Sequence, residues 1–324
     1  MERQIRIDVP GDVEAMQWVE LDLPDPGPGE VRMRHSVIGL NFIDTCHRRG
    51  IYPLPLPSGL GMEAAGVVEA VGAGVTDYRP GDRVCTFGPL PGTYATARNL
   101  PAALLFHTPG DISDELAAAA LLKGCTAEFL IERCARVQPG DTVLVHAAAG
   151  GVGLMLVQWL HHLGARVIGT TSTAEKADVV RAAGAAAVIL YTAGNVAEQV
   201  RALTGGDGVR VTFDSVGLDT WQTSLDATGR RGMIVNYGTA SGTAGLIDPG
   251  VLLLKGSLFN ARPALYDYYV TPEERAAGAA RVFDLLRRGV LNVTIGQRYT
   301  LAELAQAHRD LEGRRTIGSS VMTP

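Results

Sequence analysis

A glycine-rich segment at residues 147–153, Ala-Ala-Ala-Gly-Gly-Val-Gly, is the part of the sequence best suited to bind a phosphate. Small residues let the backbone turn sharply and approach the phosphate, whose charge then meets free N–H groups at the start of a helix. Such a segment can also be only a tight turn. Here the patterns of a strand (142–146), a helix (151–163) and a second strand (166–171) surround it, so the sequence favours a dinucleotide site.

The residues after the second of these strands discriminate between the two nicotinamide cofactors. An Asp or Glu there binds the ribose 2′-hydroxyl of NAD and repels a 2′-phosphate. This chain has Ser172 and Thr173 instead, with Lys176 one helical turn on, so we predict NADPH rather than NADH. The alternative is that Ser172 or Thr173 only caps the next helix, with Glu175 and Lys176 as solvated surface residues. Glu175 is the residue that argues against NADPH.

The glycine-rich segment lies within residues 123–265, where short apolar runs alternate with helical patterns. This alternation is typical of βαβ units and predicts an α/β, doubly wound parallel sheet that binds a nucleotide. About six strands are expected, at residues 142–146, 166–171, 187–191, 209–213, 232–237 and 256–260. Helices are expected between them, at residues 151–163, 174–183 and 196–203.

The two ends of the chain have a different texture. Roughly the first 120 residues carry β-branched runs separated by Gly and Pro turns, which predicts a mostly β domain with strands at 5–9, 31–38, 65–71 and 83–87. The tail from Thr271 contains two amphipathic helices and a last strand pattern at 318–322. We therefore divide the chain into residues 1–122, 123–265 and 266–324, and the last segment can return to the first domain.

Composition narrows the classes of partner. The 324 residues include 34 acidic and 29 basic side chains, a net charge of -5 without any block of like charge, so a nucleic acid or an anionic membrane is not expected as a partner. Four scattered cysteines form no C-x-x-C pair and no disulfide framework, which fits a reducing cytoplasm. The N-terminus has no apolar signal segment, and no run approaches the ~20 apolar residues that span a bilayer.

Several motifs occur in an order and spacing that belong to one known family. They are Gly39-Leu40-Asn41-Phe42-Ile43-Asp44-Thr45, Pro57-Ser58-Gly59-Leu60-Gly61-Met62-Glu63-Ala64-Ala65-Gly66, Gly81-Asp82-Arg83-Val84, the loop ending at Gly153, Asp214-Ser215-Val216-Gly217, Lys255-Gly256-Ser257-Leu258 and Gly318-Ser319-Ser320. Over almost its whole length the chain resembles the zinc-free quinone oxidoreductases of the medium-chain dehydrogenase/reductase superfamily, the group that includes zeta-crystallin. The resemblance implies a Rossmann domain inserted in a GroES-like, mostly β catalytic domain that both ends of the chain form, and a homodimer.

The resemblance also implies roles for individual residues. The nicotinamide end of the cleft would be lined by Asn41, Phe42, Ile43, Asp44, Thr45 and Cys46, with Tyr52 beside the substrate. The pyrophosphate would be held by Gly151 and Val152, the 2′-phosphate region by Ser172, Thr173 and Lys176, and the adenosine side by Tyr191. The rest of the cofactor groove would be formed by Val216, Gly238, Thr239, Ala240, Ser241 and Arg314.

One position departs from the family pattern. Relatives often have a tyrosine where this chain has Cys46, so an aromatic side of the site is lost and the substrate preference is affected. Cys46 can equally be a small buried apolar side chain, which is common for free cysteines.

The same resemblance predicts that the protein holds no metal. Zinc-dependent relatives bind catalytic zinc through a cysteine and a His-Glu pair, where this chain has Asn41 and Met62 before Glu63. A neutral amide and a thioether are poor ligands for Zn²⁺ compared with thiolate and imidazole.

The absence of zinc ligands constrains the expected reaction. Hydride addition to a simple ketone leaves charge on an alkoxide, which needs a metal or a strong acid to stabilise it. A quinone gives a delocalised phenolate, so positioning against the nicotinamide suffices. We predict an NADPH-dependent quinone oxidoreductase that transfers hydride or electrons to a small quinone, with Asn41 and Tyr52 donating hydrogen bonds to the acceptor oxygen or serving only structure. The alternatives are an NADPH-dependent reductase of enones or 2-alkenals and a non-catalytic NADPH-binding redox sensor.

Overall fold

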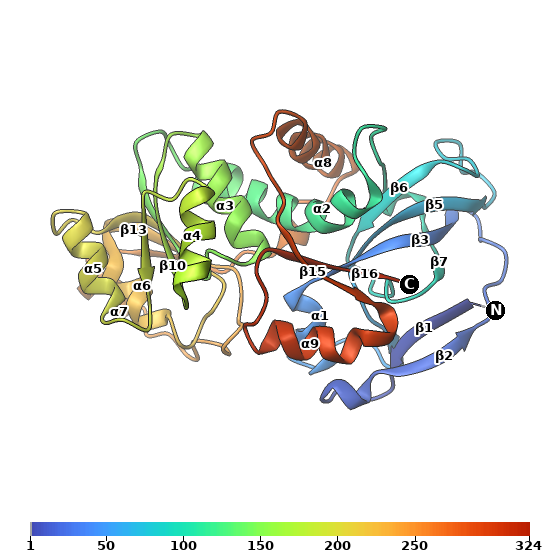
Figure 1. The fold of residues 1–324 in the computed structure, drawn as a ribbon, viewed down its shortest axis with the longest axis horizontal. Helices are drawn as coiled ribbons and strands as arrows, with labels where there is room; N and C mark the ends of the chain where they lie inside the picture. Colours follow the sequence, from blue (N-terminus) through green and yellow to red (C-terminus); the bar gives the residue numbers. More distant parts are fainter. Residues whose placement is uncertain (1) are drawn as a thin grey trace. The chain divides into compact units, whose positions relative to one another are not determined.

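The computed structural model describes residues 2–324 and divides the chain into two compact units (Figure 1). Unit 1 comprises the chain up to Lys123 together with Thr271–Ala279 and Val293–Pro324, and unit 2 comprises Gly124–Val270 and Ala280–Asn292. Both ends of the chain therefore belong to unit 1, and the sequence of unit 2 is inserted between them.

Unit 2 contains the predicted doubly wound sheet. Its strands are β9 (Thr142–Val145), β10 (Arg166–Thr171), β11 (Ala187–Leu190), β12 (Val209–Asp214), β13 (Thr228–Asn236) and β14 (Phe259–Ala261). They form one six-stranded sheet in the order β11-β10-β9-β12-β13-β14, and all neighbouring pairs are parallel. This order, with two βαβ halves that diverge from β9 and β12, is that of dinucleotide-binding sheets, so the prediction of six strands is confirmed.

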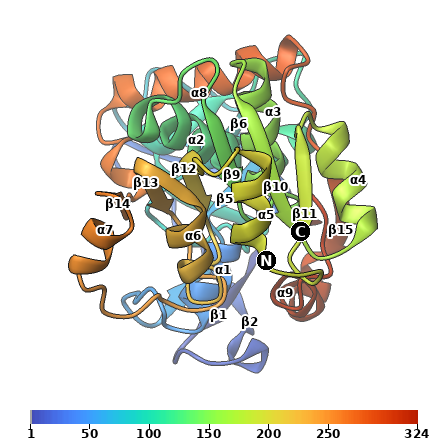
Figure 2. The same ribbon diagram turned by 90° about the vertical axis from the view of Figure 1, so that its left-hand side faces the viewer.

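Helices cover both faces of this sheet (Figure 2). They are η3 (Phe129–Ala135), α3 (Gly151–His162), α4 (Ala174–Ala182), α5 (Val196–Leu203), α6 (Trp221–Ala227), α7 (Gly250–Leu254) and η4 (Leu265–Asp267). Successive residues of β10 face opposite sides, because strand side chains alternate. Ile168 belongs to a buried cluster with Val200 of α5, whereas a Cβ on Gly169 would lie 2.8 Å from Val180 of α4.

The last two strands of the sheet differ from the predicted ranges. β13 begins at Thr228 rather than at residue 232, because its first half carries exposed arginines that interrupt the apolar pattern. β14 begins only at Phe259, because Gly256 and Ser257 have φ angles of 108° and 56° and turn the chain after α7. A turn of this kind cannot be part of a strand.

Unit 1 is mostly β, as predicted. Its strands are β1 (Glu2–Ile7), β2 (Gln17–Leu21), β3 (Glu30–Leu40), β4 (Ser58–Gly59), β5 (Glu63–Val71), β6 (Arg83–Phe87), β7 (Ala97–Pro101), β8 (Leu105–His107), β15 (Ile295–Thr300) and β16 (Ser319–Thr323). The larger sheet has seven strands in the order β15-β16-β3-β5-β6-β8, with β7 also paired to β3. The smaller sheet has the order β2-β1-β4. Because β16 pairs with β3, the tail returns to the first domain, which the sequence left open.

The core of unit 1 lies between these sheets and short helices. The helical elements are η1 (Val13–Ala15), α1 (Phe42–Arg48), η2 (Ala102–Leu104), η5 (Leu301–Glu303) and α9 (Leu304–Glu312). The cluster of fully buried apolar side chains includes Ile7 of β1, Met33 of β3 and Met322 of β16. The last strand of the chain therefore packs into the same core as the first.

Two helices contain the borders between the units. α2 (Asp114–Glu128) passes from unit 1 to unit 2 after Lys123, and α8 (Pro272–Arg287) passes from unit 1 to unit 2 after Ala279. This division differs from the predicted segment 266–324, since residues 266–270 and 280–292 cluster with unit 2. Within unit 2, Arg281 forms an ion pair with Glu132 at 2.9 Å.

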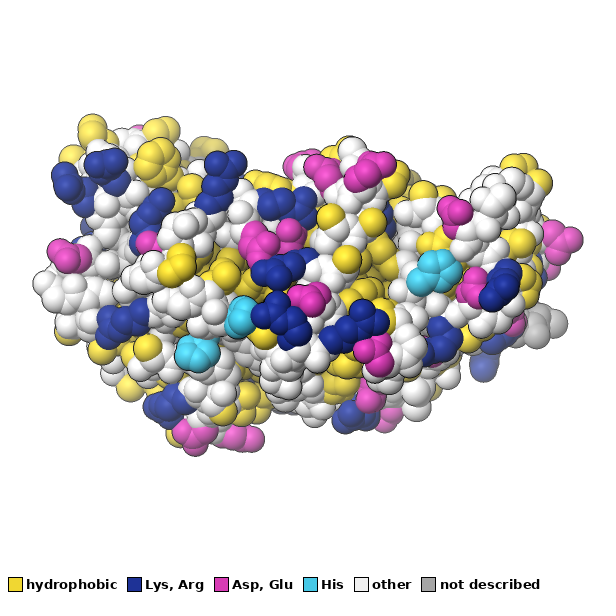
Figure 3. Space-filling view, turned by 90° about the horizontal axis from the view of Figure 1, so that it is seen from above, with side chains coloured by type: hydrophobic (Ala, Val, Ile, Leu, Met, Phe, Trp, Pro, Cys, Tyr) yellow, Lys and Arg dark blue, Asp and Glu magenta, His cyan; other side chains and the backbone are white. Residues whose placement is uncertain are grey.

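The described part of the chain contains no helix that is both long and apolar enough to cross a bilayer. On the face drawn in Figure 3, basic and acidic side chains are interspersed, in keeping with the mixed charge pattern of the sequence.

Candidate functional site

The predicted cofactor residues of unit 2 lie in five loops that follow the carboxyl ends of five neighbouring strands. Because these strands are parallel, their carboxyl ends share one edge of the sheet. The loops carry Gly151 and Val152 after β9, Ser172, Thr173 and Lys176 after β10, Tyr191 after β11, Val216 after β12, and Gly238, Thr239, Ala240 and Ser241 after β13. The structure thus brings these residues to the edge at which doubly wound sheets bind ligands.

The loop after β9 is built for close backbone approach. Gly150 is the N-cap of α3, and the first N–H groups of that helix have no acceptor within the helix. A Cβ on Gly153 would lie 2.4 Å from the carbonyl oxygen of Ala147, so only glycine fits at this turn of the helix. The loop therefore presents N–H donors and the positive end of a 12-residue helix to the edge of the sheet.

The loop after β10 has no carboxylate before the helix starts. Thr173 is the N-cap of α4, and its Oγ1 accepts a hydrogen bond from the N–H of Lys176 at 3.3 Å. The capping alternative therefore applies to Thr173, while Ser172 is half-buried and its carbonyl oxygen accepts a bond from Thr192 at 3.4 Å. Lys176 is half-buried and Glu175 is exposed. Ser172 and Lys176 thus place a hydroxyl and an ammonium group beside the N-terminus of α4, an arrangement that suits a phosphate.

The loops after β12 and β13 are joined to each other by hydrogen bonds. The N–H and Oγ of Ser241 both donate to the carbonyl oxygen of Val216 at 2.9 Å, and the N–H of Ala240 donates to Ser215 at 3.2 Å. A Cβ on Gly238 would lie 2.3 Å from the carbonyl oxygen of Ser215, so the two backbones touch there. These loops form one wall of fixed shape.

In unit 1, Asn41 lies where β3 ends and α1 begins. Asn41 is the N-cap of α1, and its N–H donates to Asp44 Oδ2 at 2.9 Å while the N–H of Asp44 donates to the Asn41 carbonyl oxygen at 3.0 Å. This reciprocal pairing satisfies the start of the helix and explains why the chain turns at this residue.

The side chain of Asn41 is held by a buried ion pair. Its Nδ2 donates to Glu63 Oε2 at 3.0 Å, and Lys123 Nζ lies 3.0 Å from the same oxygen. The N–H of Leu122 donates to Glu63 Oε1 at 2.6 Å. Glu63 is fully buried and Lys123 is 5% exposed, so these charges compensate each other away from water.

This arrangement limits what Asn41 can offer to a ligand. Its amide N–H groups donate to Glu63 and, at 3.5 Å, to the carbonyl oxygen of Gly39. The amide oxygen faces the N–H of Asp44 in the capping box of α1 and has a second lone pair, so toward a ligand it accepts rather than donates. A hydrogen bond donated by Asn41 to an acceptor oxygen, as considered from the sequence, would require its bond to Glu63 or its longer bond to Gly39 to break.

The other predicted residues of unit 1 differ in exposure. The structure leaves Phe42, Ile43 and Tyr52 half-buried, but it buries the side chains of Asp44, Thr45 and Cys46. Asp44 therefore does not line a site through its side chain as expected. Its carboxylate is turned inward to the N–H of Asn41 and the hydroxyl of Tyr94, which lies 2.8 Å away.

Two predicted residues lie outside α1. The N–H of Tyr52 donates to the carbonyl oxygen of Cys46 at 3.4 Å, and its ring meets His47 edge-on at 6.3 Å. Arg314 is exposed in unit 1 just after α9, with a positive φ of 58°.

Sequence reasoning missed the buried polar groups that surround Asn41. These are Arg48, Glu63, Tyr94, Lys123 and His308. Only Glu63 lies in a motif quoted for the family. The pattern there gives a meaning to its neighbour Met62, which replaces a zinc ligand, but no role to Glu63 itself. The others come from segments far apart in the sequence, and no spacing signal joins them.

Possible metal ligands are not gathered at one place in the described residues. Among residues 2–324 no group of three or more His, Cys, Asp or Glu side chains is arranged to hold a metal ion. Asn41 is engaged with Glu63, and Met62 is buried with an exposed fraction of 2%.

Comparison with known proteins places the chain in a family. Residues 27–110 match the family model described as "Alcohol dehydrogenase GroES-like domain", and residues 151–261 match "Zinc-binding dehydrogenase". The chain is 47% identical to a quinone oxidoreductase of Pseudomonas aeruginosa over 100% of both chains. It is also 47% identical to a 2-haloacrylate reductase of a Burkholderia species, over 97% of this chain and 96% of that protein.

Solved structures agree with these relatives. The crystal structure of Escherichia coli quinone oxidoreductase complexed with NADPH superposes with a TM-score of 0.97, at 43% identity, over 99% of this chain and 100% of that chain. The GroES-like and Rossmann architecture that the resemblance implied is thereby confirmed. The chain belongs to the quinone oxidoreductase family of the medium-chain dehydrogenase/reductase superfamily.

Proposed function

We propose that this protein is an NADPH-dependent quinone oxidoreductase that works without a metal. The observation that carries the proposal is the edge of the unit 2 sheet, where Ser172 and Lys176 flank the N-terminus of α4 and no acid stands between β10 and α4. An anion with one more phosphate than NAD finds donors there, and the nearest carboxylate, that of Glu175, is exposed to solvent in the first turn of α4. The full-length similarity to quinone oxidoreductases supports the reaction class.

The binding roles follow from the loops at that edge. The N–H groups of Gly151 and Val152 would receive the pyrophosphate, because they start α3. Ser172, Thr173 and Lys176 would surround the 2′-phosphate, and Tyr191, which is 40% exposed, would lie against the adenosine. The joined loops that contain Val216, Gly238, Thr239, Ala240 and Ser241 would form the wall of the groove, and Arg314 would contribute from unit 1.

The chemistry requires little of the protein beyond positioning. Bound NADPH supplies a hydride, and the quinone takes it up with one proton to give the hydroquinone and NADP⁺. The negative charge that develops on the acceptor oxygen is delocalised over an aromatic ring, so an acid or metal is not needed to hold it. In unit 1, Asn41 offers an amide oxygen to orient a donor group of the nicotinamide, and the half-buried Tyr52 offers a hydroxyl to the acceptor.

A second candidate substrate has support from one relative. The 2-haloacrylate reductase at 47% identity is named for a substrate with a carbon–carbon double bond next to a carboxylate. Reduction of such a bond by hydride also leaves a delocalised anion. An α,β-unsaturated carbonyl compound is therefore the alternative acceptor for the same site.

The decisive experiment measures turnover in protein freed of metals. After dialysis against a chelator, we expect NADPH absorbance to fall rapidly when a small benzoquinone is added, and NADH to be consumed much more slowly. The rate with NADPH should equal that of the untreated protein, since Asn41 and Met62 leave no adequate ligand set for zinc.

The outcomes separate the alternatives. Loss of turnover on chelation, restored by zinc, would contradict the metal-free reaction. Consumption of NADPH with 2-chloroacrylate or an enone, but not with quinone, would favour the second substrate class. Tight NADPH binding without turnover on any acceptor would indicate a redox sensor.

We further propose that the protein is a homodimer of the cytoplasm. β14 is the last strand in the order of the unit 2 sheet, and large apolar side chains of the same region are exposed, with Leu254 at 85% and Phe259 at 57%. An edge strand with apolar neighbours favours pairing with the same strand of a second copy. None of the four cysteines, all within the described residues, forms a disulfide, in keeping with a reducing compartment.

Replacing Phe259 with aspartate is expected to convert the dimer to a monomer at micromolar concentration. A charge on each copy would meet its symmetry mate across the pairing axis, and burying it costs several kcal/mol. Light scattering coupled to size exclusion measures the mass directly. Val9→Asp, at an exposed apolar residue of unit 1, is the control and should leave the mass unchanged. A wild-type monomer, or a dimer that survives Phe259→Asp, would contradict this interface.

A further inference from the structure

A continuous chain of buried hydrogen bonds leads from α9 to the cap of α1 within unit 1. Arg48 Nη1 lies 3.0 Å from His308 Nδ1, and His308 Nε2 lies 3.2 Å from the hydroxyl of Tyr94. That hydroxyl donates to Asp44 Oδ2 at 2.8 Å, and the same oxygen accepts the N–H of Asn41 at 2.9 Å. Arg48, Tyr94, Asp44 and His308 are each at most 1% exposed.

The direction of every bond in this chain is determined. A guanidinium group only donates, so His308 Nδ1 must accept from Arg48. Burial and the charge of Arg48 lower the pKa of His308 to about 3, so the ring is neutral and carries its hydrogen on Nε2. His308 therefore donates to the Tyr94 oxygen, and Tyr94 uses its own hydrogen for Asp44. Each residue of the chain therefore donates to the next one, and the last acceptor is the Asp44 carboxylate.

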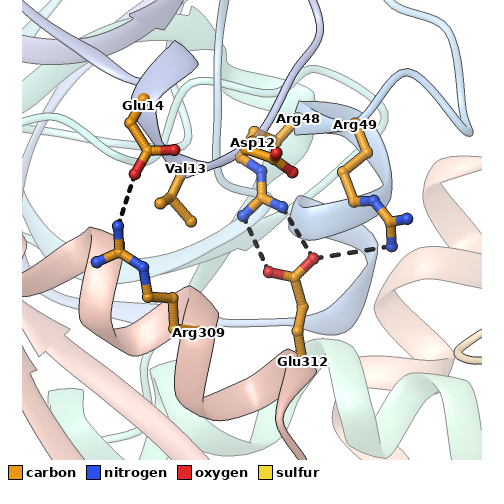
Figure 4. Close-up of a pocket in the computed structure, with 7 residues that line it drawn as sticks. All are labelled: Asp12, Val13, Glu14, Arg48, Arg49, Arg309 and Glu312. Atoms are coloured by element: carbon orange, nitrogen blue, oxygen red, sulfur yellow. Dashed lines mark hydrogen bonds and ion pairs between the residues drawn. The ribbon is translucent and has the colours of Figure 1, made fainter.

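The outer end of the chain is fixed at the protein surface. Arg48 donates to both oxygens of Glu312, at 2.8 and 3.1 Å, in the bidentate geometry seen in Figure 4. Glu312 and Arg309 come from α9 and face a pocket of about 290 Å³, where Arg309 pairs with Glu14 at 2.7 Å. Thus two links join α9 to α1. Glu312 of α9 binds Arg48, and His308 of α9 is connected to Asp44 through Tyr94.

The inner end of the chain is sensitive to the loss of a single bond. Asp44 Oδ1 is buried and has no hydrogen-bond partner among the described residues, so the carboxylate is held through Oδ2 alone. Oδ2 receives two hydrogen bonds, one from Tyr94 and one from Asn41. Without the bond from Tyr94, the Asp44 carboxylate would keep only its hydrogen bond from the N–H of Asn41, the N-cap of α1.

We propose that Asp44, Tyr94 and His308 are positioning residues that hold Asn41 in the place from which it orients the nicotinamide. The proposal rests on the proposed function, which gives Asn41 its role toward the cofactor. In it, the C-terminal helix α9 determines the setting of a residue at the other end of the sequence, through hydrogen bonds rather than through contact with the ligand.

The charge on Asp44 gives the proposal a measurable signature. Burial raises the pKa of Asp44 to about 7, while the bonds from Tyr94 and Asn41 lower it. Among the charged groups that face it, Lys123 on α2 lowers this pKa and Glu63 on β5 raises it. Arg48 lies on the same helix as Asp44, and its charge lowers the pKa of Tyr94. Protonation weakens Asp44 as an acceptor, so the hold on Asn41 is present above this pKa and is lost as the pH falls through it.

Tyr94→Phe tests the proposal by removing only the bridging hydroxyl. We expect kcat for NADPH and benzoquinone to fall on the order of tenfold near neutral pH, with a much smaller change in KM for NADPH. The acid limb of the kcat profile should move to higher pH, because the bond that lowers the pKa of Asp44 is gone. Tyr78→Phe is the matched control, since it removes a hydroxyl that donates to the carbonyl oxygen of Leu105 at 2.8 Å elsewhere in unit 1.

A second pair of variants covers the case that Tyr94→Phe does not fold. His308→Gln keeps an acceptor for Arg48 and a donor for Tyr94, and should retain the wild-type profile, whereas His308→Leu breaks the chain and should shift it. Folded variants with an unshifted acid limb, or equal shifts in Tyr78→Phe and Tyr94→Phe, would overturn the proposal. A wild-type protein without quinone turnover would instead remove the proposed function, and this inference with it.

Discussion

Replacing Lys123 with methionine lowers the free energy of unfolding by about 3 to 5 kcal/mol. The change leaves the carboxylate of Glu63, which is fully buried, without its cation. Asn41 Nδ2 and the N–H of Leu122 still donate to it, but dipoles compensate a buried charge less well than an ammonium group does. Urea-induced unfolding followed by circular dichroism measures the loss.

Two further variants show whether burial is the cause. Glu115 lies on α2, as Lys123 does, and forms an exposed ion pair with Arg298. Arg298→Met removes one partner of this pair and should lower the free energy of unfolding by less than about 1 kcal/mol. The double variant Glu63→Gln/Lys123→Met removes both charges and should regain part of the loss, because no uncompensated charge remains. If Lys123→Met cost no more than Arg298→Met, the buried pair would contribute no more than a surface pair.

Changing Ser172 to aspartate reverses the preference between cofactors. A carboxylate at this place would lie next to the 2′-phosphate, and the repulsion should lower kcat/KM for NADPH roughly a hundredfold. The same carboxylate can accept the 2′-hydroxyl of NADH, so kcat/KM for NADH should stay level or rise. Steady-state kinetics with both cofactors and one quinone give the ratio.

A matched charge change tests whether position matters. Arg181→Gln alters the net charge by the same amount in the last turn of α4, where Arg181 pairs with Asp178 at the surface. It should leave the cofactor ratio unchanged. If Ser172→Asp lowered kcat/KM for NADPH and for NADH by the same factor, the 2′-phosphate would have to bind elsewhere.

Periodicity predicted the doubly wound sheet with good accuracy, for a physical reason. Buried parallel strands are short apolar runs, and helices between them have one apolar face, so both leave a local signal. The ranges 166–171 and 83–87 coincide with β10 and β6. α2 was missed, because after its first turn this helix is apolar and buried nearly all round, so it has no amphipathic period, and the predicted border at Lys123 therefore falls inside it.

Sequence patterns also predict some residues of the site better than others, because only some of them leave a local signal. Residues that bind through backbone groups, such as Gly151 and Val152, follow from a local motif. The setting of Asn41 does not, since Glu63, Lys123 and Tyr94 reach it from three separate elements. Asp44 was predicted to line the site, but a carboxylate in the third position of a helix often caps its own N-terminus, and here it does so from the interior.

The place of β16 in the larger sheet of unit 1 constrains how the protein is made. β16 lies between β15 and β3, and it pairs with residues that leave the ribosome near the beginning of synthesis. Unit 2 is complete in sequence earlier, except for the end of α8, and can gather its six strands while translation continues. Unit 1 lacks β16 until residues 319–323 are made, so until then the end of β3 at residues 38–40, beyond its pairing with β7, exposes a short unpaired edge that a chaperone has reason to cover.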